Sequence, residues 1–98
     1  MGGMLDMNGL TGAIAQRVEP LLTEESRGMM ASAHREGDPD FLIYMGLQYA
    51  LLDDVMIPMD ILDALAQKLD EPSFTPGMIP ESRKWLAENR ARTERLGA

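Results

Sequence analysis

The longest apolar stretch of the chain runs from Phe41 to Leu52 (FLIYMGLQYALL), and Gln48 is its only strongly polar side chain. A helix on the surface of a small domain carries one apolar stripe, with polar residues opposite. Wound at about 100° per residue, this segment is apolar nearly all round. It must therefore be covered by the rest of the chain or by a second chain.

The composition predicts a single folded domain. The chain has 98 residues, of which 45% are hydrophobic and 26% charged, as is ordinary for a globular protein. The absence of cysteine excludes disulfides, thiolate metal sites and cysteine nucleophiles. Asp53 and Asp54 close the longest apolar run well before the length of a membrane span, and the N-terminus does not resemble a signal peptide, so we expect a cytoplasmic protein.

Residues that start and stop helices recur along the chain, whereas alternating strand patterns do not. Thr23 and Asp38 are expected N-caps, and Gly37 is placed to end a helix in the left-handed conformation. Pro39 suits the first position of the following helix. These signals predict helices at about 10–19 (with Asn8 as a candidate cap), 23–37, 39–55, 58–69 and 81–96, and a Pro/Gly loop at about 70–80.

We therefore predict an all-α fold, a compact bundle of four to five short helices around the central apolar helix at about 39–55. Residues 1–8 are expected to form a flexible N-terminus and residues 9–98 a single helical domain. The last helix, at about 81–96, is polar, with Trp85, Leu86 and Leu96 as its main apolar contacts.

One face of the central helix carries two small residues, Gly46 and Ala50, four positions apart. Small side chains at this spacing let another helix approach closely, and that helix belongs either to the same chain or to a second copy. Tyr44 and Gln48 are polar groups on the opposite edge, suited to fixing the register of a dimer. We expect a homodimer in which these four residues provide the self-association surface.

The net charge of −7 is unevenly spread, since the five bases Arg83, Lys84, Arg90, Arg92 and Arg95 all lie in the last 18 residues. The acidic body disfavours nucleic acid and would suit a basic protein partner. Aspartates gather around Pro58, and methionines beside it offer flexible thioethers for an adaptable binding rim. The predicted partner-binding residues are Asp53, Asp54, Met56, Met59, Asp60, Asp63 and Met78.

Two other functions stay open. The basic C-terminal helix would serve a DNA-binding transcriptional regulator, although the gap between Leu69 and Glu81 is too long for a helix-turn-helix. The aspartate cluster would alternatively bind a divalent metal or serve a small enzyme, since Mg²⁺ and Ca²⁺ prefer oxygen ligands. His34 is the only histidine, and a lone histidine does not define a catalytic triad.

Phosphate-binding glycine loops, zinc-protease motifs and nucleophile elbows are absent from the sequence. We predict no catalytic residue and no cofactor. The expected function is that of a non-enzymatic, cytoplasmic protein–protein interaction module, an acidic helical homodimer that binds a basic protein. Immunity proteins, antitoxins and adaptors are comparable classes by analogy only.

Overall fold

The computed structural model describes residues 6–96, and within that range the chain is built from helices without strands. Two short 3₁₀ turns, η1 (Glu19–Leu21) and η2 (Pro76–Met78), lie between them. The bundle predicted from the sequence is confirmed as an all-α fold. Its five α-helices are α1 (Met7–Arg17), α2 (Glu24–Glu36), α3 (Pro39–Leu52), α4 (Met59–Leu69) and α5 (Ile79–Arg95).

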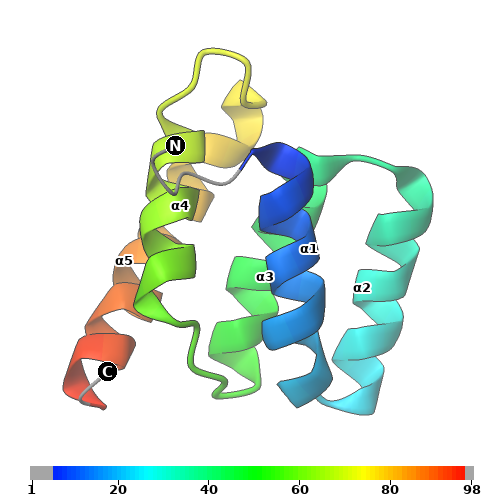
Figure 1. The fold of residues 1–98 in the computed structure, drawn as a ribbon, viewed down its shortest axis with the longest axis vertical. Coiled ribbons are helices and arrows are strands. Elements are labelled where there is room, and N and C mark those ends of the chain that lie inside the picture. Colours follow the sequence, from blue (N-terminus) through cyan, green and yellow to red (C-terminus); the bar gives the residue numbers. More distant parts are fainter. Residues whose placement is uncertain (1–5, 97–98) are drawn as a thin grey trace.

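The five helices run alternately down and up, with α3 in the middle of the bundle (Figure 1). Helix α3 packs against α1, α2 and α5, and α4 completes the bundle by packing against α1 and α5. Short connections at both ends make each helix antiparallel to the next. The chain itself therefore supplies the cover that the apolar third helix requires on most of its circumference.

The hydrophobic core lies where α1, α3 and α4 meet. Six residues of α3 are buried, and their neighbours come from regularly spaced positions on α1 and α4, as the amphipathic pattern of these helices predicts. The core side chains of these three helices include Leu10, Ile14, Leu42, Ile43, Leu47, Ile61, Leu62, Leu65 and Leu69.

The predicted start and end of α2 and the predicted start of α3 are confirmed. The Thr23 side chain accepts a hydrogen bond from the Ser26 amide at 3.2 Å, and Asp38 accepts one from the Phe41 amide at 3.2 Å. Gly37 ends α2 with φ of 69°, a left-handed conformation that glycine adopts at little cost. Pro39 occupies the first turn of α3.

The ends of three helices differ from the prediction. Helix α1 begins at Met7 because Asp6, rather than Asn8, accepts a hydrogen bond from the Gly9 amide at 2.7 Å. Residues 7 and 8 of the expected flexible N-terminus at 1–8 lie in the first turn of α1, and residues 1–5 lie outside the described range.

Helix α3 stops at Leu52 instead of Val55, since Asp54 turns the chain with φ of 62°. Helix α5 begins at Ile79 instead of Glu81, because Pro80 fits its first turn, where no amide is needed.

Candidate functional site

The aspartates around Pro58 do not form a common acidic site. Asp60 pairs with Arg17 of α1 at 2.8 Å, and Asp63 pairs with Arg90 of α5 at 3.0 Å. Asp54 pairs with Arg92, also of α5. The hydrogen bond from Arg17 lowers the pKa of the Asp60 carboxyl. Each of these three carboxylates therefore pairs with a cation of its own chain and links two elements, while it stays 60–86% exposed.

Asp53 connects the end of α3 with the start of α2. One of its carboxylate oxygens accepts hydrogen bonds from the Thr23 amide at 3.0 Å and from the Thr23 hydroxyl at 3.1 Å. The backbone hydrogen bond from Thr23 is the main cause of a lowered pKa at Asp53. This residue stabilises the fold, which is a sufficient reason for a carboxylate at the C-terminal end of a helix.

The acidic residues also fail to converge on a metal position. Within residues 6–96, no three carboxylate or imidazole groups lie close enough together to hold an ion. Calcium and magnesium need several oxygen ligands around one point. The described part of the chain therefore gives no support to the metal-binding alternative.

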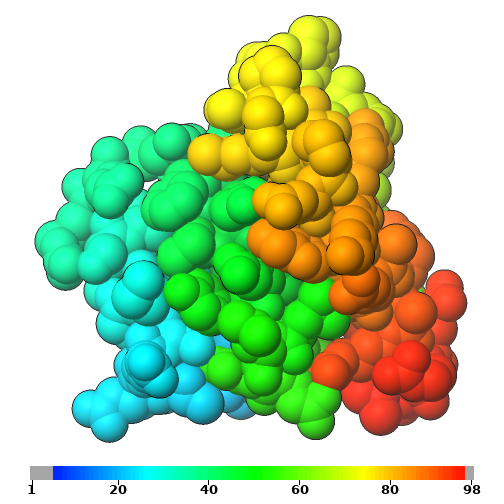
Figure 2. Space-filling model, turned by 180° about the vertical axis from the view of Figure 1, so that it is seen from behind, coloured from blue at the N-terminus to red at the C-terminus, as the bar shows by residue number. Residues whose placement is uncertain are grey.

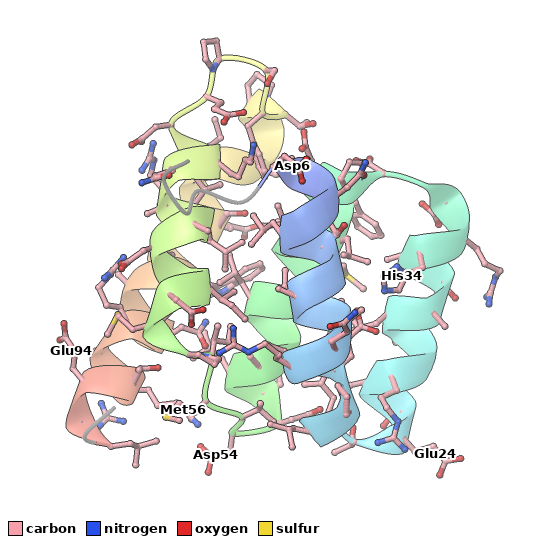
Figure 3. All side chains as sticks on the ribbon, viewed as in Figure 1. Asp6, Glu24, His34, Asp54, Met56 and Glu94 are labelled. Atoms are coloured by element: carbon pink, nitrogen blue, oxygen red, sulfur yellow. The ribbon has the colours of Figure 1, made fainter. Side chains whose placement is uncertain are left out.

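The three methionines predicted as an exposed rim are all partly buried. Met59 and Met78 pack against the hydrophobic core, and the Met59 sulfur lies 3.3 Å from Nη1 of Arg90. Met56 lies with Asp54 at the end of the molecule where α5 finishes (Figure 3). Met59 and Met78 thus fill space between helices, and Met59 shares its contact to Arg90 with Asp63.

The small residues of α3 face the inside of the molecule. Gly46 and Ala50 are both buried. A Cβ atom at Gly46 would lie 3.7 Å from side-chain atoms of Ile14 and of Met30. The close approach that this pair permits is thus made by α1 and α2 of the same chain, and neither residue is open to a second copy in this fold.

One side of α3 stays uncovered. Helix α2 packs on one flank of α3 and α5 on the other, and these two outer helices make no extensive contact with each other. Figure 2 shows α3 in green between α2 in cyan and α5 in orange. The partly or fully exposed residues of α3 in this stripe are Phe41, Tyr44, Gln48, Leu51 and Leu52.

Aromatic rings gather on this open side. The ring centroids of Phe41 and Tyr44 are 6.3 Å apart, and those of Tyr44 and Trp85 are 4.9 Å apart. All three rings are only partly buried, and Leu52 nearby on α3 is 66% exposed. We call this set the aromatic surface: Phe41, Tyr44, Gln48 and Leu52 of α3 with Trp85 of α5.

The sequence predicts Tyr44 and Gln48 as interface residues, whereas Phe41, Leu52 and Trp85 are not predicted from it. Phe41, Gln48 and Leu52 share one side of a helix by their spacing of seven and four, which is visible in the sequence. That side was not identifiable as the open one, because α3 is apolar on every side. Trp85 is recognisable in the sequence as a candidate interface residue, because it is the only tryptophan of the chain and the largest side chain on a polar helix.

The edge of the aromatic surface is acidic. The Glu81 carboxylate accepts a hydrogen bond from the Tyr44 hydroxyl at 2.6 Å, and this bond raises the pKa of Tyr44. Glu88 is exposed and lies on the same side of α5 as Trp85, three residues away. Arg92 follows on that side, but its side chain is only 15% exposed and pairs with Asp54. Arg92 is thus already neutralised, whereas Lys84, which lies between Glu81 and Glu88 at spacings of three and four, has no ion pair within residues 6–96.

The bases of the C-terminal helix are mostly engaged in the same way. Arg83 pairs with Asp70 at 2.6 Å, and the pairs of Arg90 and Arg92 are described above. Of the five bases of α5, Lys84 and Arg95 are the two without an ion pair within residues 6–96. Helix α5 therefore presents no stripe of free cations of the kind that binds phosphates.

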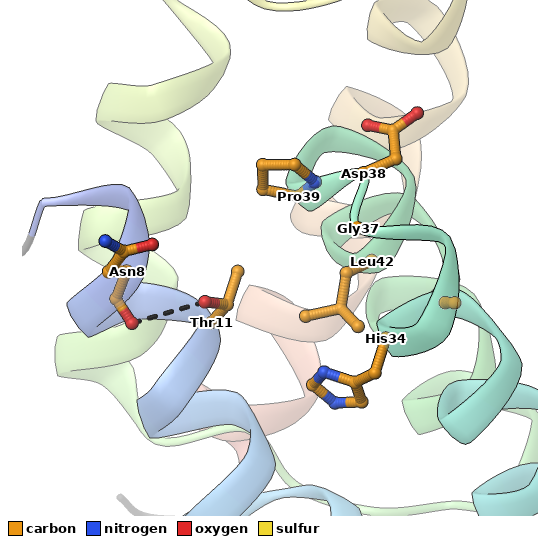
Figure 4. Close-up of a pocket in the computed structure, with 8 residues that line it drawn as sticks. Asn8, Thr11, His34, Gly37, Asp38, Pro39 and Leu42 are labelled. Carbon is orange, nitrogen blue, oxygen red and sulfur yellow. Dashed lines mark hydrogen bonds between the residues drawn. The ribbon is translucent and has the colours of Figure 1, made fainter.

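A small hollow lies between the first turn of α1 and the end of α2, with a volume of about 180 Å³ (Figure 4). His34 lines it, and its Nε2 lies 2.7 Å from a carboxylate oxygen of Glu19. Ligand pockets are commonly about 300–1,000 Å³. The hollow is smaller than this, and the Thr11 hydroxyl that lines it together with His34 donates to the backbone carbonyls of Met7 and Asn8.

Comparison of the chain with models of known protein families, with curated proteins and with solved structures finds no match. Within residues 6–96, each helix is too short or too polar to cross a lipid bilayer.

Proposed function

We propose that this chain is a non-enzymatic, cytoplasmic protein–protein interaction module that binds through the aromatic surface. The observation that carries the proposal is the cluster of Phe41, Tyr44 and Trp85 on the uncovered side of α3. Tryptophan and tyrosine are enriched among the residues that dominate binding energy at protein interfaces. A chain this small has few large side chains, and three of its five aromatic residues are in this cluster.

The chemistry of the partner follows from charge. The chain carries a net charge of −7, and the acidic groups Glu81 and Glu88 lie beside the aromatic surface. Complementary charge speeds association and disfavours partners of like charge. We therefore keep the prediction of a basic protein partner and move its contact site from the aspartates around Pro58 to the aromatic surface. Immunity proteins, antitoxins and adaptors remain comparable classes by analogy.

Self-association is the second candidate. Tyr44 and Gln48, two of the four residues expected at a dimer interface, lie on the open side of α3. A homodimer would therefore use the aromatic surface and leave Gly46 and Ala50 in the core. The acidic edge opposes this pairing, since two copies would bring like charges together.

Site-specific photo-crosslinking tests the proposal in the cells in which the chain is produced. A photoreactive residue at Leu52, which is 66% exposed, should give crosslinks to one or a few defined proteins. The same residue at Leu21, which is 63% exposed on the η1 turn, provides a matched control outside the aromatic surface. Identical products from the two positions would contradict an interaction surface at α3.

A further inference from the structure

The aromatic surface has the dimensions of a helix-binding site. Its exposed residues on α3 run from Phe41 to Leu52, a span of about 16 Å at 1.5 Å per residue. This equals about three turns of a helix. The flanking helices α2 and α5 pack on either side of α3 and border the surface along its length. An amphipathic helix laid over a strip of this kind buries residues at every third or fourth position.

The charges on both borders favour a cationic occupant. On α5, Glu81 and Glu88 stand on the side of Trp85 with the exposed Lys84 between them, so these three residues give this border a net negative charge. On α2, the edge that faces away from α1 carries the exposed Glu25 and Glu36, with Met29 between them at helical spacing. Met29 is 45% exposed and extends the apolar character of the strip.

Resting on the function proposed above, we propose that the partner binds as a basic amphipathic helix laid along α3 between α2 and α5. Its apolar side would cover Phe41, Tyr44, Gln48 and Leu52 and contact Trp85. Lysine or arginine residues on its two flanks would face the glutamates of α2 and α5. A second copy of the chain fits less well, because each copy presents the same acidic borders.

The test uses the purified full chain and synthetic peptides of about 14 residues. One peptide is a leucine/lysine amphipathic helix, the second has the same composition in a scrambled order, and the third replaces lysine by glutamate. Trp85 is the only tryptophan, so its fluorescence reports occupancy of the aromatic surface directly. We expect saturable binding of the first peptide alone, weakened by added salt because exposed charges are screened.

Two variants with the same change in charge give the decisive comparison. Gln48→Arg places a cation in the centre of the aromatic surface, whereas Gln67→Arg places one on the exposed side of α4. We expect Gln48→Arg to weaken binding at least about tenfold, as for a central interface residue, and Gln67→Arg to change it less than about threefold. Leu52→Ser, at a position that is 66% exposed, serves if circular dichroism shows that Gln48→Arg is unfolded.

Equal weakening by Gln48→Arg and Gln67→Arg would mean general charge attraction and overturn the inference, as would equal binding of the scrambled peptide. If no peptide binds while Leu52 still gives defined crosslinks, the interaction surface stands and its partner has another chemistry. If Leu52→Ser instead abolishes a homodimer, a second copy is the occupant. Failure of the crosslinks at Leu52 together with failure of all peptides would remove the proposed function itself.

Discussion

At the scale of single residues, the carboxylate of Asp53 stabilises the junction of two helices by accepting both polar hydrogens of Thr23. We expect Asp53→Ala to lower the free energy of unfolding by about 1 kcal/mol, as for a hydrogen bond of this type. Asp63→Ala removes an ion pair whose carboxylate is 60% exposed, and should cost less than about 0.5 kcal/mol. Urea denaturation of both variants checks this, and equal costs would contradict the role of Asp53.

The lowered pKa of Asp53 also gives its contribution a pH dependence. A carboxyl with a lower pKa in the folded state stabilises the fold above its unfolded pKa of about 3.9. That stabilisation is lost as the pH falls through the folded pKa. The difference in unfolding free energy between the native chain and Asp53→Ala should therefore be constant from pH 5 to 7 and shrink below about pH 4. A difference that persists undiminished at pH 2 would show that the charged form is not the stabilising one.

Asp54 ends α3 in a left-handed conformation, with φ of 62°. Aspartate tolerates this region, whereas a β-branched side chain does not. We expect Asp54→Val to destabilise the chain by about 1–2 kcal/mol. Asp54→Gly should lose less stability than Asp54→Val, since both variants lose the pair with Arg92 but glycine adopts the left-handed conformation freely. Thermal unfolding of both variants would reveal whether backbone conformation or the ion pair matters more.

At the scale of elements, α5 is held by polar contacts where a core helix would use apolar ones. Ser82, Asn89 and Thr93 are fully buried, and Leu86 is its one buried large apolar residue. Asn89 donates hydrogen bonds to the backbone carbonyls of Leu47 and Trp85, at 3.2 and 2.8 Å. Three arginines of α5 add ion pairs to Asp54, Asp63 and Asp70. Helix α5 is thus attached largely by polar and charged side chains, which need hydrogen-bond or ion-pair partners on the neighbouring elements.

Thr93 provides the clearest test of this polar attachment. Its hydroxyl donates a hydrogen bond to the Ile57 carbonyl at 2.7 Å in a buried position. Thr93→Val keeps the volume but leaves that carbonyl without its partner, so we expect a loss of about 1–3 kcal/mol in the free energy of unfolding. Thr93→Ser retains the hydroxyl and should lose less. If valine proves as stable as threonine, the hydrogen bond contributes little to the attachment of α5.

Some helix ends can be predicted from the sequence, whereas the buried side of α5 cannot, and the difference has a physical reason. Local signals such as Thr23, Gly37 and Pro39 determine helix ends by their own backbone chemistry, so these boundaries are readable from the chain. The inner side of α5 was not readable. Leu96, expected as an apolar contact, is 63% exposed, whereas Asn89 is fully buried. Burial of a polar group depends on partners elsewhere in the chain, here the carbonyl of Leu47, and no local pattern identifies them.

The same limit applies to the candidate site. The aspartates form a dense cluster in the sequence, yet each meets an arginine or threonine from a distant element, as Asp60 meets Arg17. Only long-range packing decides whether an acidic residue stays free. The aromatic surface was hidden for a related reason, because a helix that is apolar all round gives no indication of which side is left open.

The fit between α3 and its neighbours can be tested at Gly46. A methyl group there would lie at ordinary contact distance, 3.7 Å, from Ile14 and Met30. Gly46→Ala should therefore stabilise the chain by up to about 1 kcal/mol through helix propensity. Gly46→Leu should destabilise it by about 1–3 kcal/mol through overpacking. Both effects should be independent of protein concentration, since the contacts lie within one chain; a dependence on concentration would place Gly46 at an interface between copies.

At the scale of the whole molecule, the apolar third helix is enclosed on three sides by its own chain and is open on the fourth. On the enclosed sides, the apolar side chains of the run from Phe41 to Leu52 are buried by helices of the same chain, without a second subunit. The side that stays open is the aromatic surface with its acidic borders. The net charge of −7 therefore bears on association rather than on folding.

Salt should affect the two candidate occupants of the aromatic surface in opposite directions. Binding of a basic helix gains from attraction to Glu81 and Glu88, so screening weakens it. Pairing of two copies suffers repulsion between their acidic borders, so screening strengthens it.

Sedimentation equilibrium of the chain alone separates these cases. It is run at about 50 and 500 mM salt, between which the Debye length falls from about 14 to 4 Å. We expect a monomer at low salt and, if copies pair at all, only at high salt. A different result, a dimer that forms at low salt and dissociates as salt is added, would require complementary charges across the contact. The acidic borders of α2 and α5 do not provide them, so such a dimer would form through another face of the molecule.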